Sequence, residues 1–167
     1  SVTTLDGKLS RAMEPRAAQP QVRIDTIRAL AEAGIPVSVM VAPVIPAVTD
    51  HEIETILTRA HEAGAREAGY VLLRLPLEVA TLFENWLETY FPDRKDHVMS
   101  LVRGSRGGKN YDSTFGVRMT GSGPYAWMIG RRFEIAAQRN GYSARRLKLR
   151  TDLFQRPERT GEQLKLF

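Results

Sequence analysis

The chain has 167 residues, of which 43% are hydrophobic, enough for one domain with a sizeable core and too many for a disordered tail. It contains no cysteine, which excludes disulfides, thiolate metal sites and a cysteine nucleophile within these residues. There is no run of about eighteen apolar residues, as a membrane span requires, and no signal-peptide pattern, so we expect a cytoplasmic protein without a membrane partner.

Charge is distributed unevenly along the chain. Residues 1–100 carry ten Lys or Arg and fourteen Asp or Glu, for a net charge of minus four, whereas residues 101–167 carry fourteen and five, for plus nine. A basic segment of this kind favours a polyanionic partner, of which nucleic acid is the commonest. The alternative is a solvated basic surface without a partner.

The first half of the chain alternates between strand and helix patterns. Residues 1–5 are expected to end a strand, and residues 36–44 and 68–75 are almost continuously apolar, which is typical of strands buried on both faces. Helical spacing of apolar residues predicts helices over residues 20–34 and 50–64. This alternation predicts three parallel strands joined by helical crossovers, and three strands cannot close a barrel, so we expect a partner half upstream.

Local signals mark where these two helices begin. Pro20 suits the first turn of a helix, because it has no backbone N–H to leave unbonded. Thr49 and Glu52 fit a capping box before the second helix. Gly34 and Gly64 are expected to end the two helices.

The second half of the chain is predicted to be helical and then extended. Helices are expected over residues 77–90, 95–103 and 124–140, and a glycine-rich loop between the last two carries Arg106 and Lys109. The residues after about 141 are rich in arginine and poorly periodic. We therefore divide the chain into residues 1–76, a helical extension over 77–141 and a basic tail over 142–167.

The carboxyl ends of the three strands are the first candidate site, because ligands of parallel α/β folds bind there. This criterion selects Ser1 and Thr3, then Ala42 and Pro43 within residues 42–46, then Arg74 within residues 74–76. The hydroxyls could bond a ribose or a carboxylate, the backbone of residues 42–46 a flat base, and Arg74 an anion. The alternative is that the hydroxyls serve only as caps or turn residues.

Several segments resemble a known family in their order and spacing. The segments SVTTLD, AMEPRAA and PQVRIDTIRALAEAGIPVSVMVAPVIPAVTD contain a serine at a strand end, a Glu-Pro pair, an arginine at a helix start and an Ala-Pro pair. These are Ser1, Glu14-Pro15, Arg23 and Ala42-Pro43. Residues 1–76 thereby resemble the carboxy-terminal barrel strands of radical S-adenosylmethionine (SAM) proteins of the spore photoproduct lyase group.

The resemblance implies a fold, a chemistry and roles for individual residues. The fold would be α/β, the last three parallel strands of a partial TIM-type (radical SAM) barrel followed by the helical extension. A 4Fe-4S cluster would reduce SAM to a 5′-deoxyadenosyl radical that removes hydrogen from a substrate. Ser1 would contact SAM and Ala42 would present its backbone to the adenosyl group, whereas Glu14 and Arg23 would form a structural ion pair or cap. The alternative is that Arg23 contacts SAM directly.

The missing cysteines separate this chain from the family pattern, because no thiolate is present to hold a cluster. The chain also begins with serine, within a segment that reads as the end of a buried strand. We therefore expect an excerpt of a longer enzyme whose cluster ligands lie upstream, rather than a decayed enzyme.

The last residues form a second recognisable pattern. Gln163, Leu164, Lys165, Leu166 and Phe167 resemble the pentapeptide by which bacterial repair and replication proteins hold the sliding clamp. Two apolar anchors and a glutamine on an extended tail suit a hydrophobic groove with a polar corner. The alternative is that these residues fold back as a small strand. Arginines of the basic segment could contact phosphates, namely Arg131, Arg132, Arg145, Arg146 and Arg150.

The sequence thus predicts part of a radical SAM enzyme that acts in DNA repair or nucleic-acid modification. One alternative is a non-catalytic module that binds DNA or the sliding clamp. Another is a radical SAM enzyme that acts on a small molecule or a protein, in which case binding to DNA should be absent.

Overall fold

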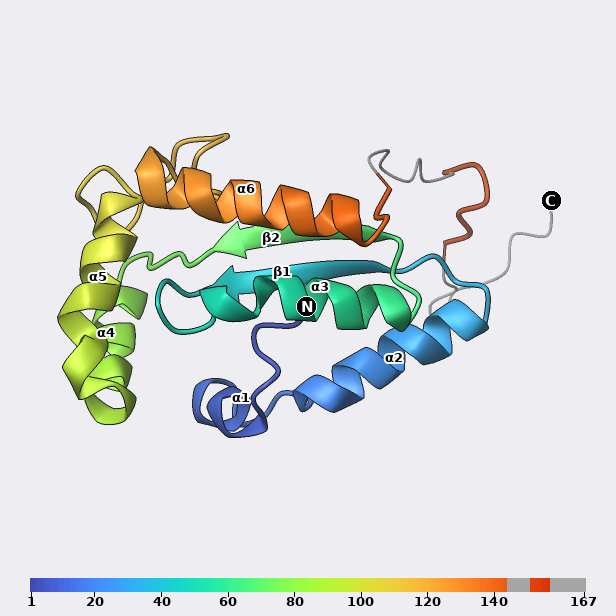
Figure 1. Cartoon of the computed structure of the whole chain (residues 1–167), viewed down its shortest axis with the longest axis horizontal. Helices are drawn as coiled ribbons and strands as arrows, with labels where there is room; N and C mark the ends of the chain where they lie inside the picture. The colour runs from blue at the N-terminus through green and yellow to red at the C-terminus, as the bar shows by residue number, and fades with distance from the viewer. Residues whose placement is uncertain (144–150, 157–167) are drawn as a thin grey trace, which may run out of the picture.

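The structure of the protein is a computed structural model that describes residues 1–143 and 151–156. Within these residues, a two-stranded parallel sheet packs against α-helices, as Figure 1 shows. The elements in chain order are α1 (Gly7–Met13), α2 (Pro20–Glu32), β1 (Ser38–Val44), η1 (Asp50–Glu52), α3 (Ile53–Glu62), β2 (Glu67–Leu72), α4 (Val79–Tyr90), η2 (Pro92–Arg94), α5 (Lys95–Gly104) and α6 (Gly123–Arg139), where η marks a short 3-10 helix.

The prediction of three strands from a partial TIM-type barrel is wrong. The described sheet contains β1 and β2, which run parallel with Ser38 opposite Glu67 and Val41 opposite Tyr70. The first expected strand contributes one isolated parallel bridge, from Val2 to Val41. The fold over the described residues is therefore a small α/β arrangement with two strands.

A carboxylate draws the first segment away from the sheet. Glu52 accepts hydrogen bonds from the Thr4 hydroxyl (2.5 Å) and from the Leu5 backbone N–H (2.6 Å). The Leu5 backbone N–H is thereby bonded to a side chain instead of to a neighbouring strand. The expected capping box is also wrong, because the Thr49 hydroxyl accepts a hydrogen bond from the Ile45 backbone N–H (2.9 Å) and does not cap a helix.

The helices of the expected pattern are confirmed, and α1 is an addition to it. Asp6 caps α1, since its Oδ1 atom accepts hydrogen bonds from the backbone N–H groups of Lys8 (2.7 Å) and Leu9 (3.2 Å). α2 begins at Pro20, as the missing N–H of proline predicts. The turn after α2 contains Gly34 at φ +75°, a conformation that glycine adopts without strain.

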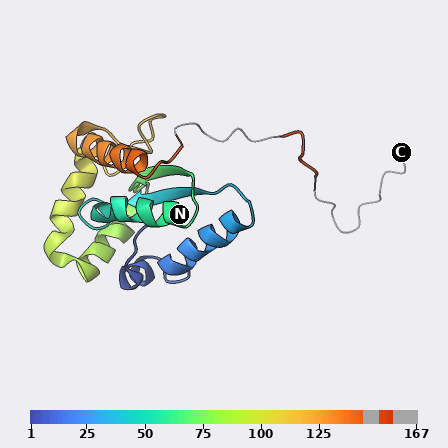
Figure 2. The same cartoon turned by 45° about the vertical axis from the view of Figure 1, so that its right-hand side comes forward.

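Two clusters of buried side chains hold these elements together. In the first, α2, α3 and α6 pack with the sheet, and α3 lies between α2 and α6, as Figures 1 and 2 show. In the second, α4 and α5 pack against the chain that follows each strand, beyond the arrowheads of β1 and β2 in Figure 1. The first cluster includes Ile24, Val39, Val41, Ile53, Ile56 and Ile129, and the second includes Ile45, Leu73, Leu75, Leu87, Val98 and Val102.

Candidate functional site at the ends of the parallel strands

Arg23 connects the residues that carry the family resemblance. Its Nη1 atom donates a hydrogen bond to the Ser1 carbonyl (2.8 Å) and lies 3.4 Å from the Ser1 hydroxyl oxygen. Its Nη2 atom donates to Glu14 Oε2 (2.9 Å), and its Nε atom donates to the Ala18 carbonyl (2.9 Å). The structural ion pair expected between Glu14 and Arg23 is confirmed. It fixes the segment before α2 against the start of the chain.

Thr3 joins the same segment to β1. The Thr3 hydroxyl donates a hydrogen bond to the Ala42 carbonyl (2.9 Å), and Thr3 is 4% exposed. Ala42 and Pro43 lie at the point where the register of β1 against β2 becomes irregular. The Thr3 hydroxyl proton is therefore used within the fold, whereas Ser1 is exposed and the Ala42 carbonyl retains a second lone pair.

We expect replacement of Thr3 by valine to lower the free energy of unfolding by about 1 kcal/mol, because the Ala42 carbonyl would lose a donor in a buried setting. Urea unfolding followed by tryptophan fluorescence would measure the change. The matched control is Thr26→Val, since Thr26 is exposed and its hydroxyl donates only to the Val22 carbonyl of its own helix. Equal losses in the two variants would contradict this role for Thr3.

Arg74 faces the loop before α6 instead of contacting Thr3 or Ala42. Its Nη2 atom donates a hydrogen bond to the Tyr111 hydroxyl (3.3 Å), and its Nη1 atom lies 3.4 Å from Met119 Sδ. The guanidinium carbon lies 5.6 Å from the centre of the Tyr111 ring. The strand-end residues thus divide into one group around Ser1, Thr3 and Ala42 and a second group around Arg74.

Arg106 is the second arginine of this group, and sequence reasoning missed its role. It is 1% exposed. Its Nη2 atom donates to the carbonyls of Leu72 (2.9 Å) and Leu73 (3.0 Å), and its Nη1 atom donates to those of Val117 (3.1 Å) and Arg118 (3.0 Å). Arg106 therefore joins the end of β2 to the loop that leads into α6. An arginine beside two glycines gives no sequence signal for such burial.

Burial and neighbouring charge both act on Arg106. Burial lowers the pKa of its guanidinium, the positive charge of Arg74 lowers it further, and Asp112 and Tyr111 act in the opposite direction. Hydrogen bonds from Thr114 hold the pKa of the Asp112 carboxyl below its usual value, and the charges of Lys109 and Arg106 act in the same direction. Positive charge thus predominates at the end of β2.

Two arginines expected to contact phosphates belong to ion pairs of α6. Arg132 donates to both carboxylate oxygens of Glu54 (2.8 and 2.7 Å) and to the Asp50 carbonyl (3.0 Å). Arg131 forms an ion pair with Glu134 (2.6 Å). The Arg132 contacts fix α6 on α3, which gives this residue a structural role.

The strand ends do not form an open groove. Ile45 and Leu75, which follow β1 and β2, are 2% and 1% exposed in the cluster with α4 and α5. A hollow of about 380 Å³ lies instead beside the first segment, where Ser1, Arg23, Thr26 and Ser38 contribute to its lining. The exposed Ser1 hydroxyl therefore has space for a ligand next to it.

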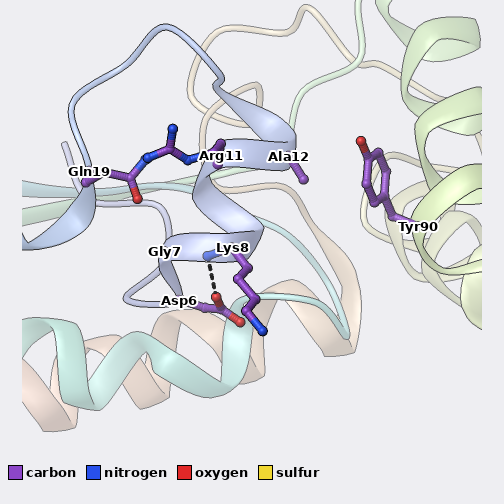
Figure 3. Close-up of a pocket in the computed structure, with 7 residues that line it drawn as sticks. All are labelled: Asp6, Gly7, Lys8, Arg11, Ala12, Gln19 and Tyr90. Carbon is purple, nitrogen blue, oxygen red and sulfur yellow. Dashed lines mark hydrogen bonds between the residues drawn. The ribbon is translucent and has the colours of Figure 1, made fainter.

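A larger hollow of about 850 Å³ lies away from the predicted residues. Figure 3 shows Asp6, Lys8 and Arg11 of the α1 region on one side of it and Tyr90 of α4 on the other. The predicted site residues do not line this hollow. The Asp6 carboxylate within it already caps α1.

Some of the predicted residues lie outside the part of the chain that the structure describes. Gln163, Leu164, Leu166 and Phe167 lie outside the described residues, as do Arg145, Arg146 and Arg150. Over the part of the chain that the structure describes, no cluster of three or more His, Cys, Asp or Glu side chains could hold a metal ion. Among the same residues, no helix has both the length and the apolar character needed to cross a membrane.

Comparison with known proteins gives partial relatives. Uncharacterized proteins of Mycobacterium bovis and of two Mycobacterium tuberculosis strains are 31% identical to the chain over 105 residues, which is 62% of this chain and 31% of each relative. An uncharacterized protein of Acidianus two-tailed virus is 41% identical over 46 residues, 28% of this chain and 15% of the viral protein. The chain thus spans less than a third of the mycobacterial relatives' length. No family model and no solved structure matches the chain.

Proposed function

We propose that this chain is part of a longer radical SAM enzyme, related to spore photoproduct lyase, that acts on nucleic acid in the cytoplasm. The observation that carries the proposal is the contact network around Arg23 and Thr3. Arg23 joins Ser1 to Glu14, and Thr3 joins the first segment to Ala42. Four sequence features that carry the resemblance are therefore neighbours in space, which supports the view that they form one functional unit.

The residues present suit one of the two implied cofactors. SAM bound to a reduced 4Fe-4S cluster would supply the radical that removes hydrogen from the substrate. The chain has no cysteine, so the cluster ligands would have to lie in the remainder of a longer protein, for which the length of the mycobacterial relatives leaves room. Ser1 would contribute to holding SAM through its exposed hydroxyl, which lines the hollow of about 380 Å³. Ala42 and Pro43 would contribute through their backbone, outside the lining of that hollow.

Charge supports nucleic acid as the substrate. Residues 101–167 carry a net charge of plus nine. At the end of β2, the positive charges of Arg74, Arg106 and Lys109 lie near the aromatic ring of Tyr111. Positive charge placed next to aromatic side chains suits a phosphate backbone and unstacked bases. Binding of the sliding clamp by residues 163–167 would place such an enzyme on DNA.

The proposal predicts that the full-length protein binds a 4Fe-4S cluster and SAM. Anaerobic reconstitution with iron and sulfide should give about four irons per chain and a brown protein, and equilibrium dialysis should detect SAM binding. Ala42→Leu should weaken SAM binding by about tenfold or more, because its side chain would cover the backbone at the irregular position in β1. Iron content should not change, since the cluster ligands lie elsewhere.

The matched control is Ala33→Leu, an exposed alanine after α2, which should bind SAM as the unchanged protein does. Absence of a three-cysteine loop in the full-length protein would defeat the enzyme proposal and leave the non-catalytic binding module. A full cluster with equal SAM affinity in both variants would remove Ala42 from the cofactor site.

A further inference from the structure

We infer that Arg74, Lys109 and Tyr111, next to the buried charge of Arg106, form an anion site at the end of β2 that takes a backbone phosphate of single-stranded nucleic acid. The inference rests on the proposed function for the source of the phosphate, and it is independent of radical chemistry. It assigns the nucleic-acid contact to one loop of the chain. The group around Ser1, Thr3 and Ala42 has no part in it.

Arg106 brings a buried positive charge that no described carboxylate neutralises. Its four hydrogen-bond acceptors are neutral backbone carbonyls. Its Nε atom is buried without an acceptor in the described structure. A buried guanidinium is costly unless opposite charge balances it, so an uncompensated one favours an anion nearby.

Arg74 adds a second positive charge whose described partners are also neutral. They are the Tyr111 hydroxyl and ring and the Met119 sulfur. The Nε atom of Arg74 is buried and lacks a described acceptor as well. Arg106 and Arg74 interact unfavourably with each other, and an oxyanion beside Arg74 would relieve this repulsion.

Carboxylates of the described chain do not take this position. None of the ion pairs found among residues 1–143 and 151–156 includes Arg74 or Arg106. Asp112 is the carboxylate whose charge acts on Arg106, and it is half-buried and hydrogen-bonded to Thr114. Lys109, which is exposed, adds a third positive charge to the loop. Arginine binds phosphate, as it binds carboxylate, with two parallel hydrogen bonds.

An exposed aromatic residue in the same loop indicates the source of the phosphate. Phe115 is 88% exposed, and the guanidinium carbon of Arg118 lies 5.6 Å from the centre of its ring. Proteins that bind single strands combine positive charge along the backbone with aromatic side chains that stack on bases. A free phosphate would need the arginines alone, whereas a single strand of nucleic acid would also stack a base on Phe115.

The test compares binding of a fluorescein-labelled single-stranded oligodeoxynucleotide to the full-length protein and its Arg74→Gln variant, without SAM or reductant. Arg74→Gln should weaken binding by about tenfold or more, the loss expected for one charge-assisted hydrogen bond. The slope of log affinity against log salt should fall in magnitude by about one. Lys109→Gln should reduce the same slope, and Phe115→Ala should weaken binding without changing it.

Arg28→Gln provides the matched control, because it removes one positive charge from an exposed pair with Asp25 on α2. It should leave affinity within about twofold, since pairs of this kind contribute little. Equal affinities of the Arg74 and Arg28 variants would overturn the inference. A second pair of results would also overturn it: Arg74→Gln leaves oligonucleotide affinity unchanged, and inorganic phosphate shifts the NMR signals of residues 106–111. The site would then take free phosphate. Failure to assemble a cluster would not affect these measurements, so it would count against the enzyme proposal alone.

Discussion

Replacement of Arg106 by methionine should lower the free energy of unfolding by more than about 3 kcal/mol. Methionine has a similar length but cannot donate hydrogen bonds to the carbonyls of Leu72, Leu73, Val117 and Arg118. Each buried acceptor left without a donor costs about 1–3 kcal/mol. A domain of this size is stable by only about 5–15 kcal/mol, so a substantial part of its stability depends on one side chain.

An opposing effect must be weighed, because removing a buried charge also removes its desolvation cost. Hydrophobic replacement of a buried ion pair is often neutral, but there both partners leave together. Here the acceptors are backbone groups, which stay in place whatever residue stands at position 106. The loss of donors should therefore outweigh the gain from removing the charge.

Arg103→Met is the control for this prediction. Arg103 lies in α5, and its guanidinium donates to Glu84 (2.8 Å) and Asn110 (2.8 Å), with a side chain that is 45% exposed. Its replacement should cost less than about 1 kcal/mol, as is usual for exposed ion pairs. Urea unfolding monitored by the fluorescence of Trp86 and Trp127 would compare the two variants. Similar midpoints would show that Arg106 does not join β2 to the following loop in the way its contacts indicate.

The helices could be predicted because their signals are local. In α3, Ile53, Ile56, Leu57 and Ala60 recur at helical spacing, and all four are buried. Pro20 and Gly34 lie at the start of α2 and in the turn after it, as predicted. These signals depend on residues within one or two turns of each other, so the sequence contains all that is needed.

The predictions of strands and caps were wrong where a side chain distant in sequence supplies the hydrogen bonds. Residues 1–5 have a strand pattern, but Glu52 accepts hydrogen bonds from the Thr4 hydroxyl and the Leu5 backbone N–H. The same carboxylate was expected to serve a capping box with Thr49, a motif that considers only four consecutive residues. The expected strand over residues 68–75 ends at Leu72, where Arg106 donates hydrogen bonds to the carbonyls of Leu72 and Leu73.

The candidate site was predicted only in part, because its contacts also join residues that are distant in sequence. Strand-end position selected Thr3, Ala42 and Arg74, and the structure places Thr3 against Ala42 but directs Arg74 to a different loop. Position along a strand does not reveal that the Thr3 hydroxyl is buried and already bonded. Nor does it reveal Arg106, whose importance arises only when residues 72 and 73 meet residues 117 and 118.

Replacement of Gly64 by alanine should destabilise the protein by about 3 kcal/mol, the second large effect that we expect. Gly64 lies between α3 and β2 at φ +110°, and a Cβ atom there would overlap the Cβ atom of Ala31 in α2. Overpacking of this kind costs about 1–3 kcal/mol, and the positive φ adds about 1 kcal/mol for a residue with a side chain. The overpacking arises because α2 approaches the turn after α3 very closely, whereas the cost of the positive φ comes from the backbone conformation alone.

Gly34→Ala separates the two contributions, because Gly34 has φ +75° and its Cβ would meet no atom within 4 Å. It should cost about 1 kcal/mol, from the backbone alone. In the Gly64→Ala background, Ala31→Gly should recover part of the loss, so a double-mutant cycle should give a coupling of about 1–2 kcal/mol between the two positions. Zero coupling would mean that α2 moves away without cost, and the close packing of α2 on α3 would then not contribute to stability. A measurable coupling would establish that this contact, between residues of the two smallest types, determines how closely α2 approaches the end of α3.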